Sequence, residues 1–189
     1  TLLNYTAAAD DTTYDLVFKA VDKAGNLSTD SQTIKVQKDA TKPVSAIALY
    51  GTNGGNDYIN IADDYKVNAT VTFTRDNVGV NKLTFTGITS AAAATVLYNG
   101  AAAAISEQDS NSITLTNTYT SGTFTVSGLE ISSTEGNRTI GVKLTDAIGN
   151  EQSAAAEDSI NQDRTRPETS KYKVEGIHNS SWFNLRYYG

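Results

Sequence analysis

The chain has 189 residues, of which 39% are hydrophobic and 19% are charged, with a formal net charge of −6 and an isoelectric point near 4.7. This composition is sufficient for a buried core, while the negative charge disfavours a nucleic-acid partner, whose phosphates it would repel. The chain has no cysteine, which excludes disulfides, thiol catalysis and cysteine-ligated metals, and no apolar run approaches the roughly 18 residues that span a bilayer.

The first predicted element is a strand at 14–21, in which apolar residues recur at every second position. A turn at 22–26 follows, where we expect Gly25 to adopt a positive φ and Asp22 to accept hydrogen bonds from the amides of its own turn. A second strand is predicted at about 31–37.

A linker is predicted at 39–43, where the sequence reads Asp-Ala-Thr-Lys-Pro. Pro43 lacks a backbone donor, so the preceding strand cannot continue through it, and it restricts Lys42 to an extended conformation. The linker is therefore expected to be short and stiff.

Alternating apolar and polar residues predict further strands in the middle of the chain. Their apolar residues are Val67, Ala69, Val71 and Phe73, then Leu83 and Phe85, Ile113 and Leu115, Phe124 and Val126, and finally Ile140, Val142 and Leu144. The Asn99-Gly100 pair is a favoured two-residue hairpin turn, although its alanine-rich flanks bring little side chain to a sheet. Short strands at about ten-residue spacing, with no 3.6-residue periodicity, predict a β-sandwich.

The features of 14–43 return 124 positions later. Six residues of the turn and linker pair with identical residues: Asp22 with Asp146, Gly25 with Gly149, Asn26 with Asn150, Asp39 with Asp163, Thr41 with Thr165, and Pro43 with Pro167. The same shift places Leu16, Phe18 and Ala20 on Ile140, Val142 and Leu144. Core positions therefore repeat together with the turns, which predicts two copies of one structural unit.

The sequence YDLVFKAVDKAGN, followed by DATKP, resembles the end of a bacterial immunoglobulin-like (Big/Bap-type) repeat and the linker to the next. The resemblance implies an all-β fold of tandem Ig-like Greek-key sandwiches. Residues 1–41 would be the C-terminal part of one repeat, 42–165 a complete repeat, and 166–189 the N-terminal part of the next. Two departures are Ile148, where a small residue is usual, and the length of 124 residues, whose excess is assigned to the Ala-rich region 88–111.

Such repeats build large extracellular surface proteins, so the resemblance implies a non-catalytic spacer in the stalk of a cell-surface adhesin. Its partners would be neighbouring repeats, with host or cell-surface glycans bound by other domains. Two alternatives are an S-layer or filament protein, in which like subunits form a lattice, and an accessory module of a secreted polysaccharide-active enzyme.

Six aspartates are candidate calcium ligands, because Ca²⁺ takes six to eight oxygen ligands and the resemblance implies calcium where repeats meet. Asp22, Asp39, Asp63 and Asp64 are assigned to one junction, and Asp146 and Asp163 to the other. The alternative is that these carboxylates cap turns and linkers in an acidic chain. No EF-hand loop is present.

Catalytic sites are poorly represented. The single histidine, His178, lies in the trailing partial repeat, and carboxylate pairs such as Asp63/Asp64 and Glu157/Asp158 are expected by chance among 21 acidic residues. Trp182, Tyr187 and Tyr188 could form a glycan-stacking surface, although aromatic residues of a sandwich are more commonly at least half-buried.

Overall fold

The computed structural model describes the backbone of residues 12–53, 58–74, 78–166, 168, 172–174 and 185–187, and the side chains of these residues between 13 and 168. The regular structure of this part is almost entirely β, as the sequence predicts, with one 3-10 turn, η1 (Ile61–Asp63). No helix in the described part is long and apolar enough to cross a membrane. The strands form two larger sheets and two hairpins.

The first larger sheet has six strands in the order β4-β13-β12-β6-β10-β9. Their bounds are β4 (Tyr58–Ile59), β6 (Val80–Thr86), β9 (Ile105–Gln108), β10 (Ser112–Tyr119), β12 (Gly136–Asp146) and β13 (Ala156–Gln162). All neighbours are antiparallel except β4, which runs parallel to β13.

The second larger sheet has five antiparallel strands in the order β3-β5-β11-β7-β8. Their bounds are β3 (Ser45–Gly51), β5 (Lys66–Phe73), β7 (Thr95–Tyr98), β8 (Ala101–Ala102) and β11 (Gly122–Glu130). The predicted Asn99-Gly100 turn is confirmed: it joins β7 to β8 with φ values of 47° and 85°. Positive φ at both residues is what a two-residue hairpin of this type requires.

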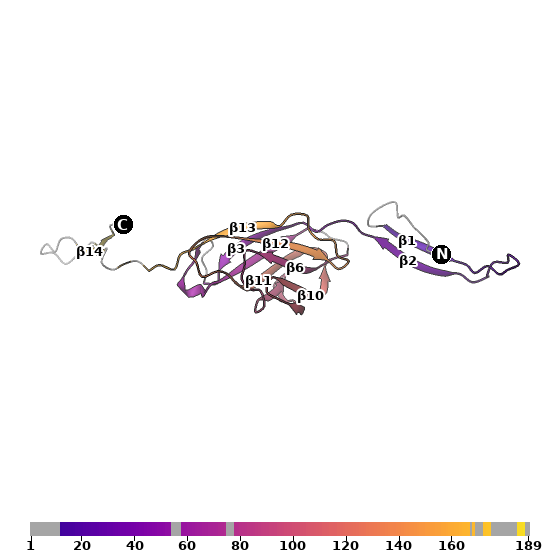
Figure 1. The fold of residues 1–189 in the computed structure, drawn as a ribbon, viewed down its shortest axis with the longest axis horizontal. Coiled ribbons are helices and arrows are strands. Elements are labelled where there is room, and N and C mark those ends of the chain that lie inside the picture. Colours follow the sequence, from indigo (N-terminus) through magenta and orange to yellow (C-terminus); the bar gives the residue numbers. More distant parts are fainter. Residues whose placement is uncertain are drawn as a thin grey trace.

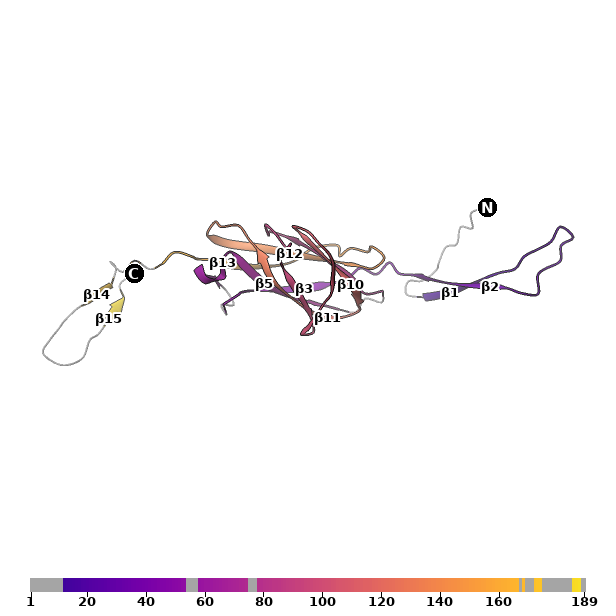
Figure 2. The same ribbon diagram turned by 90° about the horizontal axis from the view of Figure 1, so that it is seen from below.

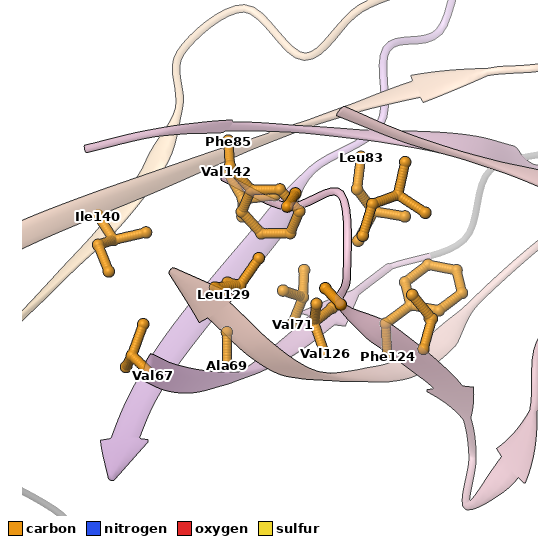
Figure 3. Close-up of a cluster of buried hydrophobic side chains, with 14 of the residues drawn as sticks. Val67, Ala69, Val71, Leu83, Phe85, Phe124, Val126, Leu129, Ile140 and Val142 are labelled. Atoms are coloured by element: carbon orange, nitrogen blue, oxygen red, sulfur yellow. The ribbon is translucent and has the colours of Figure 1, made fainter. Parts of the chain in front are cut away.

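The two sheets enclose one hydrophobic core, and together they are called the sandwich below. All the apolar side chains that the alternating pattern assigned to the core between residues 67 and 144 are buried, with exposed fractions of 6% or less. Figure 3 shows Val67, Ala69 and Val71 of β5 on one side of this core and Leu83 and Phe85 of β6 on the other. Each buried Val, Leu, Ile or Phe side chain of this set contributes roughly 1.5–3 kcal/mol through removal from water.

The hairpins lie at opposite ends of the sandwich, as Figures 1 and 2 show. One consists of β1 (Thr12–Phe18) and β2 (Gln32–Lys38), and the other of β14 (Tyr172–Val174) and β15 (Leu185–Tyr187). Within the described residues, neither hairpin pairs with a third strand. The chain therefore enters and leaves the sandwich at its two ends.

Candidate functional site

The predicted turns at 22–26 and 146–150 have the same hydrogen bonds. Asp22 Oδ1 accepts from the amides of Ala24 and Asn26, both at 2.9 Å. Asp146 Oδ1 accepts from the amides two and four positions later in the same way, at 3.0 and 2.8 Å. Each turn contains a glycine of positive φ, 90° at Gly25 and 99° at Gly149, as the sequence predicts.

The strands that flank these turns also correspond. β1 and β2 pair from Thr12 with Lys38 to Phe18 with Gln32, while β12 and β13 pair from Gly136 with Gln162 to Val142 with Ala156. Every residue of the first pairing lies 124 positions before its counterpart in the second. Because one residue of slip would move every side chain to the other face, the shared register is a strong structural correspondence.

The linker 39–43 is attached to the turn 146–150, and we call this contact the first joint. The Asn150 carboxamide Nδ2 donates both to the backbone carbonyl of Asp39, at 3.1 Å, and to Asp146 Oδ2, at 2.8 Å. The side chain of Asp39 is 8% exposed, its Oδ1 accepts from the Thr41 amide at 2.9 Å, and Pro43 is buried. The linker is thus fastened to the sandwich that it precedes.

The segment 163–166 leaves the opposite end of the sandwich, and we call its contacts the second joint. The Asp163 amide donates to the Ile59 carbonyl at 3.0 Å, and the Arg164 amide donates to Glu135 Oε1 at 2.9 Å. The Arg164 guanidinium lies over the Tyr65 ring, 3.6 Å from its centroid. The bond from the Thr165 amide to Asp163 Oδ1, at 3.0 Å, matches that of Thr41 and Asp39, but Asp163 is exposed.

The candidate aspartates are not grouped in the structure as they were grouped in the predicted junctions. Asp39 lies beside Asp146 at the first joint, whereas Asp63 and Asp64 lie in the loop after β4, whose Ile59 contacts Asp163 at the second joint. Asp22 lies in the turn at the far end of the β1–β2 hairpin. The structure therefore does not bring Asp22, Asp39, Asp63 and Asp64 together, because Asp39 and Asp63 lie near opposite ends of the sandwich.

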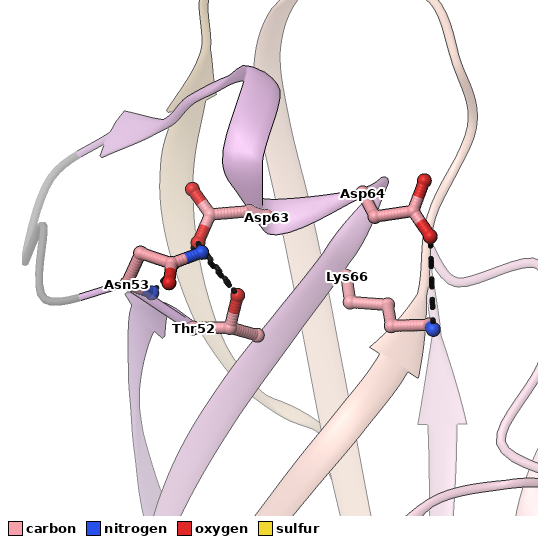
Figure 4. Close-up of polar contacts among 5 residues, drawn as sticks. All are labelled: Thr52, Asn53, Asp63, Asp64 and Lys66. Atoms are coloured by element: carbon pink, nitrogen blue, oxygen red, sulfur yellow. Dashed lines mark hydrogen bonds and ion pairs between the residues drawn. The ribbon is translucent and has the colours of Figure 1, made fainter.

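The Asp63 carboxylate is buried and closes the loop between β3 and β5 (Figure 4). Its Oδ1 accepts from the Thr52 hydroxyl at 2.7 Å and from the Asn53 amide at 2.8 Å, and its Oδ2 accepts from the Asn60 amide at 2.7 Å. Burial by itself raises the pKa of Asp63, but these hydrogen bonds outweigh it and hold the pKa below its ordinary value of 3.8. Its neighbour Asp64 is exposed and forms an ion pair with Lys66 at 3.9 Å.

This geometry favours turn capping over calcium coordination for three of the six aspartates. Asp22, Asp63 and Asp146 direct their oxygens to donors of their own loops, as described above. In the described residues, no three carboxylate, histidine or cysteine side chains come together around a possible ion. Asp39 differs, because its Oδ2 is buried and accepts no hydrogen bond from the described residues. Calcium binding stays a prediction, and Asp39 is the residue at which to test it.

Of the candidate catalytic pair Glu157/Asp158, one carboxylate makes a contact between strands and the other faces solvent. Asp158 Oδ2 accepts from the Leu49 amide at 2.8 Å and so links β13 to β3, and Glu157 is exposed. His178, Trp182 and Tyr188 lie outside the described residues, as does the side chain of Tyr187.

Sequence reasoning missed the residues around Tyr65. This residue and Asp64 have φ values of 58° and 49°, a conformation that is rare for a bulky side chain. They border an open cleft of about 530 Å³ near the second joint. The lining residues are Asp64, Tyr65, Lys66, Thr89, Glu130, Ile131, Ser132 and Ser133. No periodic signal marks this cleft, because its residues come from the ends of separate strands.

No model of a known protein family matches this chain, and no curated protein matches it.

Proposed function

We propose that this chain is a non-catalytic spacer segment in the stalk of a long bacterial cell-surface protein. The observation that carries the proposal is the second appearance, 124 positions on, of one hairpin register together with its turn and its linker. A rod of repeated units needs its ends to be constant, since each end contacts the next unit. Side chains between the ends need only alternate between apolar and polar.

In this proposal the unit is an Ig-like repeat over 42–165, preceded by part of another at 1–41 and followed by part of a third at 166–189. The order β3-β5-β11 resembles strands A, B and E of an immunoglobulin fold, and β13-β12-β6-β10 resembles its strands G, F, C and C′, which supports the proposal. The chain departs from that fold by inserting β7, β8 and β9 between β6 and β10. This insertion lies in the Ala-rich region, and it accounts for the length of the repeat.

The first joint supports a mechanical role. A proline-bearing linker samples few backbone conformations, and the Asn150 bridge ties that linker to the sandwich at a second point. Bending at the joint would break these hydrogen bonds and expose the buried side chain of Asp39. A stack of such units holds a binding domain at a distance from the cell, and its partners are the neighbouring repeats of the same chain.

The stiffness of the first joint can be measured by double electron–electron resonance between two spin labels. The chain has no native cysteine, so Gln37→Cys in the hairpin and Asn117→Cys in the sandwich, both exposed, give a unique label pair. We expect one narrow distance distribution, which Asn150→Ala broadens. Asn26→Ala is the matched control, because Asn26 has the same place in the free hairpin turn, and it should leave the distribution unchanged.

A broad distribution in the unmodified chain would remove the spacer proposal. Assembly of the purified chain into sheets or filaments would favour a lattice protein instead. The surface location is tested separately: protease added to intact cells that make the parent protein should release this segment, and protection from the protease would contradict that location.

A further inference from the structure

One face of the β1–β2 hairpin is apolar and largely uncovered. Leu16 pairs directly with Ile34, and Phe18 and Val36 lie two positions along the same strands, so these four side chains share that face. Phe18 is 38% exposed and Ile34 54%, while Leu16 and Val36 are only half-buried. A two-stranded hairpin with such a face is marginally stable in water.

Three of the four counterparts of this face, Ile140, Val142 and Ile160, are buried in the sandwich, and the fourth, Asp158, is half-buried. Ile140 and Val142, the counterparts of Leu16 and Phe18, have exposed fractions of 0% and pack in the core against the β5–β11 sheet. Figure 3 shows Ile140 and Val142 on the side of the core opposite to Leu129 and Val67. The outer edge of β12 is also occupied, because residues from Gly141 to Asp146 pair with β6. The covered face of β12–β13 thus indicates the kind of sheet that would fit the corresponding face of β1–β2.

A second copy of this chain is a poor partner for the hairpin. In a copy whose β12–β13 hairpin had been exchanged for β1–β2, Val17 would take the place of Gly141, where a Cβ would lie 2.6 Å from Thr86 Oγ1. Ile34 would replace Asp158 and leave the Leu49 amide without its carboxylate acceptor. These two mismatches favour a partner that is similar in fold but different in sequence.

We propose that the apolar face of β1–β2 docks on the inner face of an antiparallel sheet formed by polypeptide that precedes Thr1 in the parent protein. A strand equivalent to β6 pairs along residues 17–22, in the register in which β6 pairs with 141–146. The occupant is the part of a like-folded repeat that corresponds to residues 42–124, because that part contains β3 and β6, which contact β13 and β12 in the complete unit. This inference rests on the proposed tandem-repeat spacer and names the partner of its first hairpin.

Amide hydrogen exchange on two lengths of the protein tests the proposal. One is the present chain, and the other is the parent polypeptide begun one repeat earlier. We expect amides of β1 and β2 to exchange at least about 100-fold more slowly in the longer chain, because opening them then requires a whole repeat to unfold. Equal exchange in the two chains would overturn the proposal, as would protection that appears in the present chain only as its concentration rises.

Two variants in the longer chain locate the contact. Phe18→Asp places a charge where its counterpart is fully buried, and it should abolish the protection and lower the melting temperature of the preceding repeat by about 10 °C. Thr33→Glu is the control, since its counterpart Glu157 is an exposed residue of β13, and it should keep both properties. Loss of protection in the control, or its retention in Phe18→Asp, would contradict the proposed face. A flexible first joint would remove the spacer role without affecting these results.

Discussion

The hairpins β1–β2 and β12–β13 have one register, one turn and one linker pattern, yet they differ in what surrounds them. The apolar side chains of β12 are fully buried between two sheets, whereas Phe18 of β1 is 38% exposed. The local structure of both hairpins follows from alternation, a glycine of positive φ and an aspartate cap, which act over a few residues. Burial depends on strands distant in sequence. The comparison therefore separates what a hairpin encodes locally from what its neighbours add.

Truncating one core position in each hairpin should give the largest difference. Ile140→Ala removes a fully buried side chain and should lower the free energy of unfolding of the sandwich by about 2–5 kcal/mol, since it leaves a cavity. Leu16→Ala, at the corresponding place, should change it by less than about 0.5 kcal/mol. Urea unfolding followed by circular dichroism measures both. Equal losses would mean that β1–β2 is already part of a cooperative unit with the sandwich.

The turn glycines give a second paired test. Gly149→Ala forces a side chain into a backbone conformation with φ of 99° and should destabilise the sandwich by about 2 kcal/mol, although no atom lies within 4 Å of the new Cβ. Gly25→Ala imposes the same strain on the free hairpin and should leave the unfolding transition of the sandwich unchanged. A neutral result for Gly149→Ala would show that the turn relaxes to another conformation.

The two turn asparagines should differ by a smaller amount. Asn150→Ala removes the donor shared by Asp39 and Asp146 and should cost about 1 kcal/mol, measured as a lower urea midpoint at constant slope. Asn26→Ala removes only the bond to Asp22 Oδ2 and should leave that midpoint unchanged. A midpoint that stays constant in Asn150→Ala would mean that the first joint adds nothing to the stability of the sandwich.

The pH dependence of sandwich stability should depend on Asp63, which lies in the sandwich, and not on Asp22, which lies in the β1–β2 hairpin. The pKa of Asp63 is lower in the folded protein than its ordinary value of 3.8, so its contribution is complete above about pH 4 and is lost as the pH falls further. Asp63→Asn should therefore reduce the loss of sandwich stability on acidification below pH 4. The hydrogen bonds from Asn26 also lower the pKa of Asp22, but Asp22→Asn should not alter the acid profile of the sandwich. Thermal melts across this pH range measure both effects, and matching profiles for Asp63→Asn and the unmodified protein would contradict the cap.

Calcium removal should have the smallest effect. Because the carboxylates of Asp22, Asp63 and Asp146 already serve as turn caps, we expect equal melting temperatures in calcium and in a chelator. A lower melting temperature in the chelator, abolished by Asp39→Asn, would instead establish a metal at the first joint. The same substitution in chelator alone controls for loss of the hydrogen bond from Thr41.

Several elements could not be predicted because no local signal encodes them. β4 has two residues and exists only because Tyr58 and Ile59 align with the end of β13. β3 has a single fully buried apolar side chain, Leu49, so its alternation is weak. The distribution of the candidate aspartates was also not readable from the sequence, since consecutive strands carry the chain from one end of the sandwich to the other. Residues 63 and 39 therefore lie near opposite joints.

Alternation and turn chemistry were readable in the amino-acid sequence because each is encoded within a few neighbouring residues. The 124-residue correspondence was readable because identical residues recur at that spacing. They predicted the β-class, the core side chains and both aspartate-capped turns. Tertiary structure alone decided which strands pair and which linker meets which turn. It also decided that one hairpin is enclosed while its twin is open, because burial depends on contacts between residues far apart in the chain.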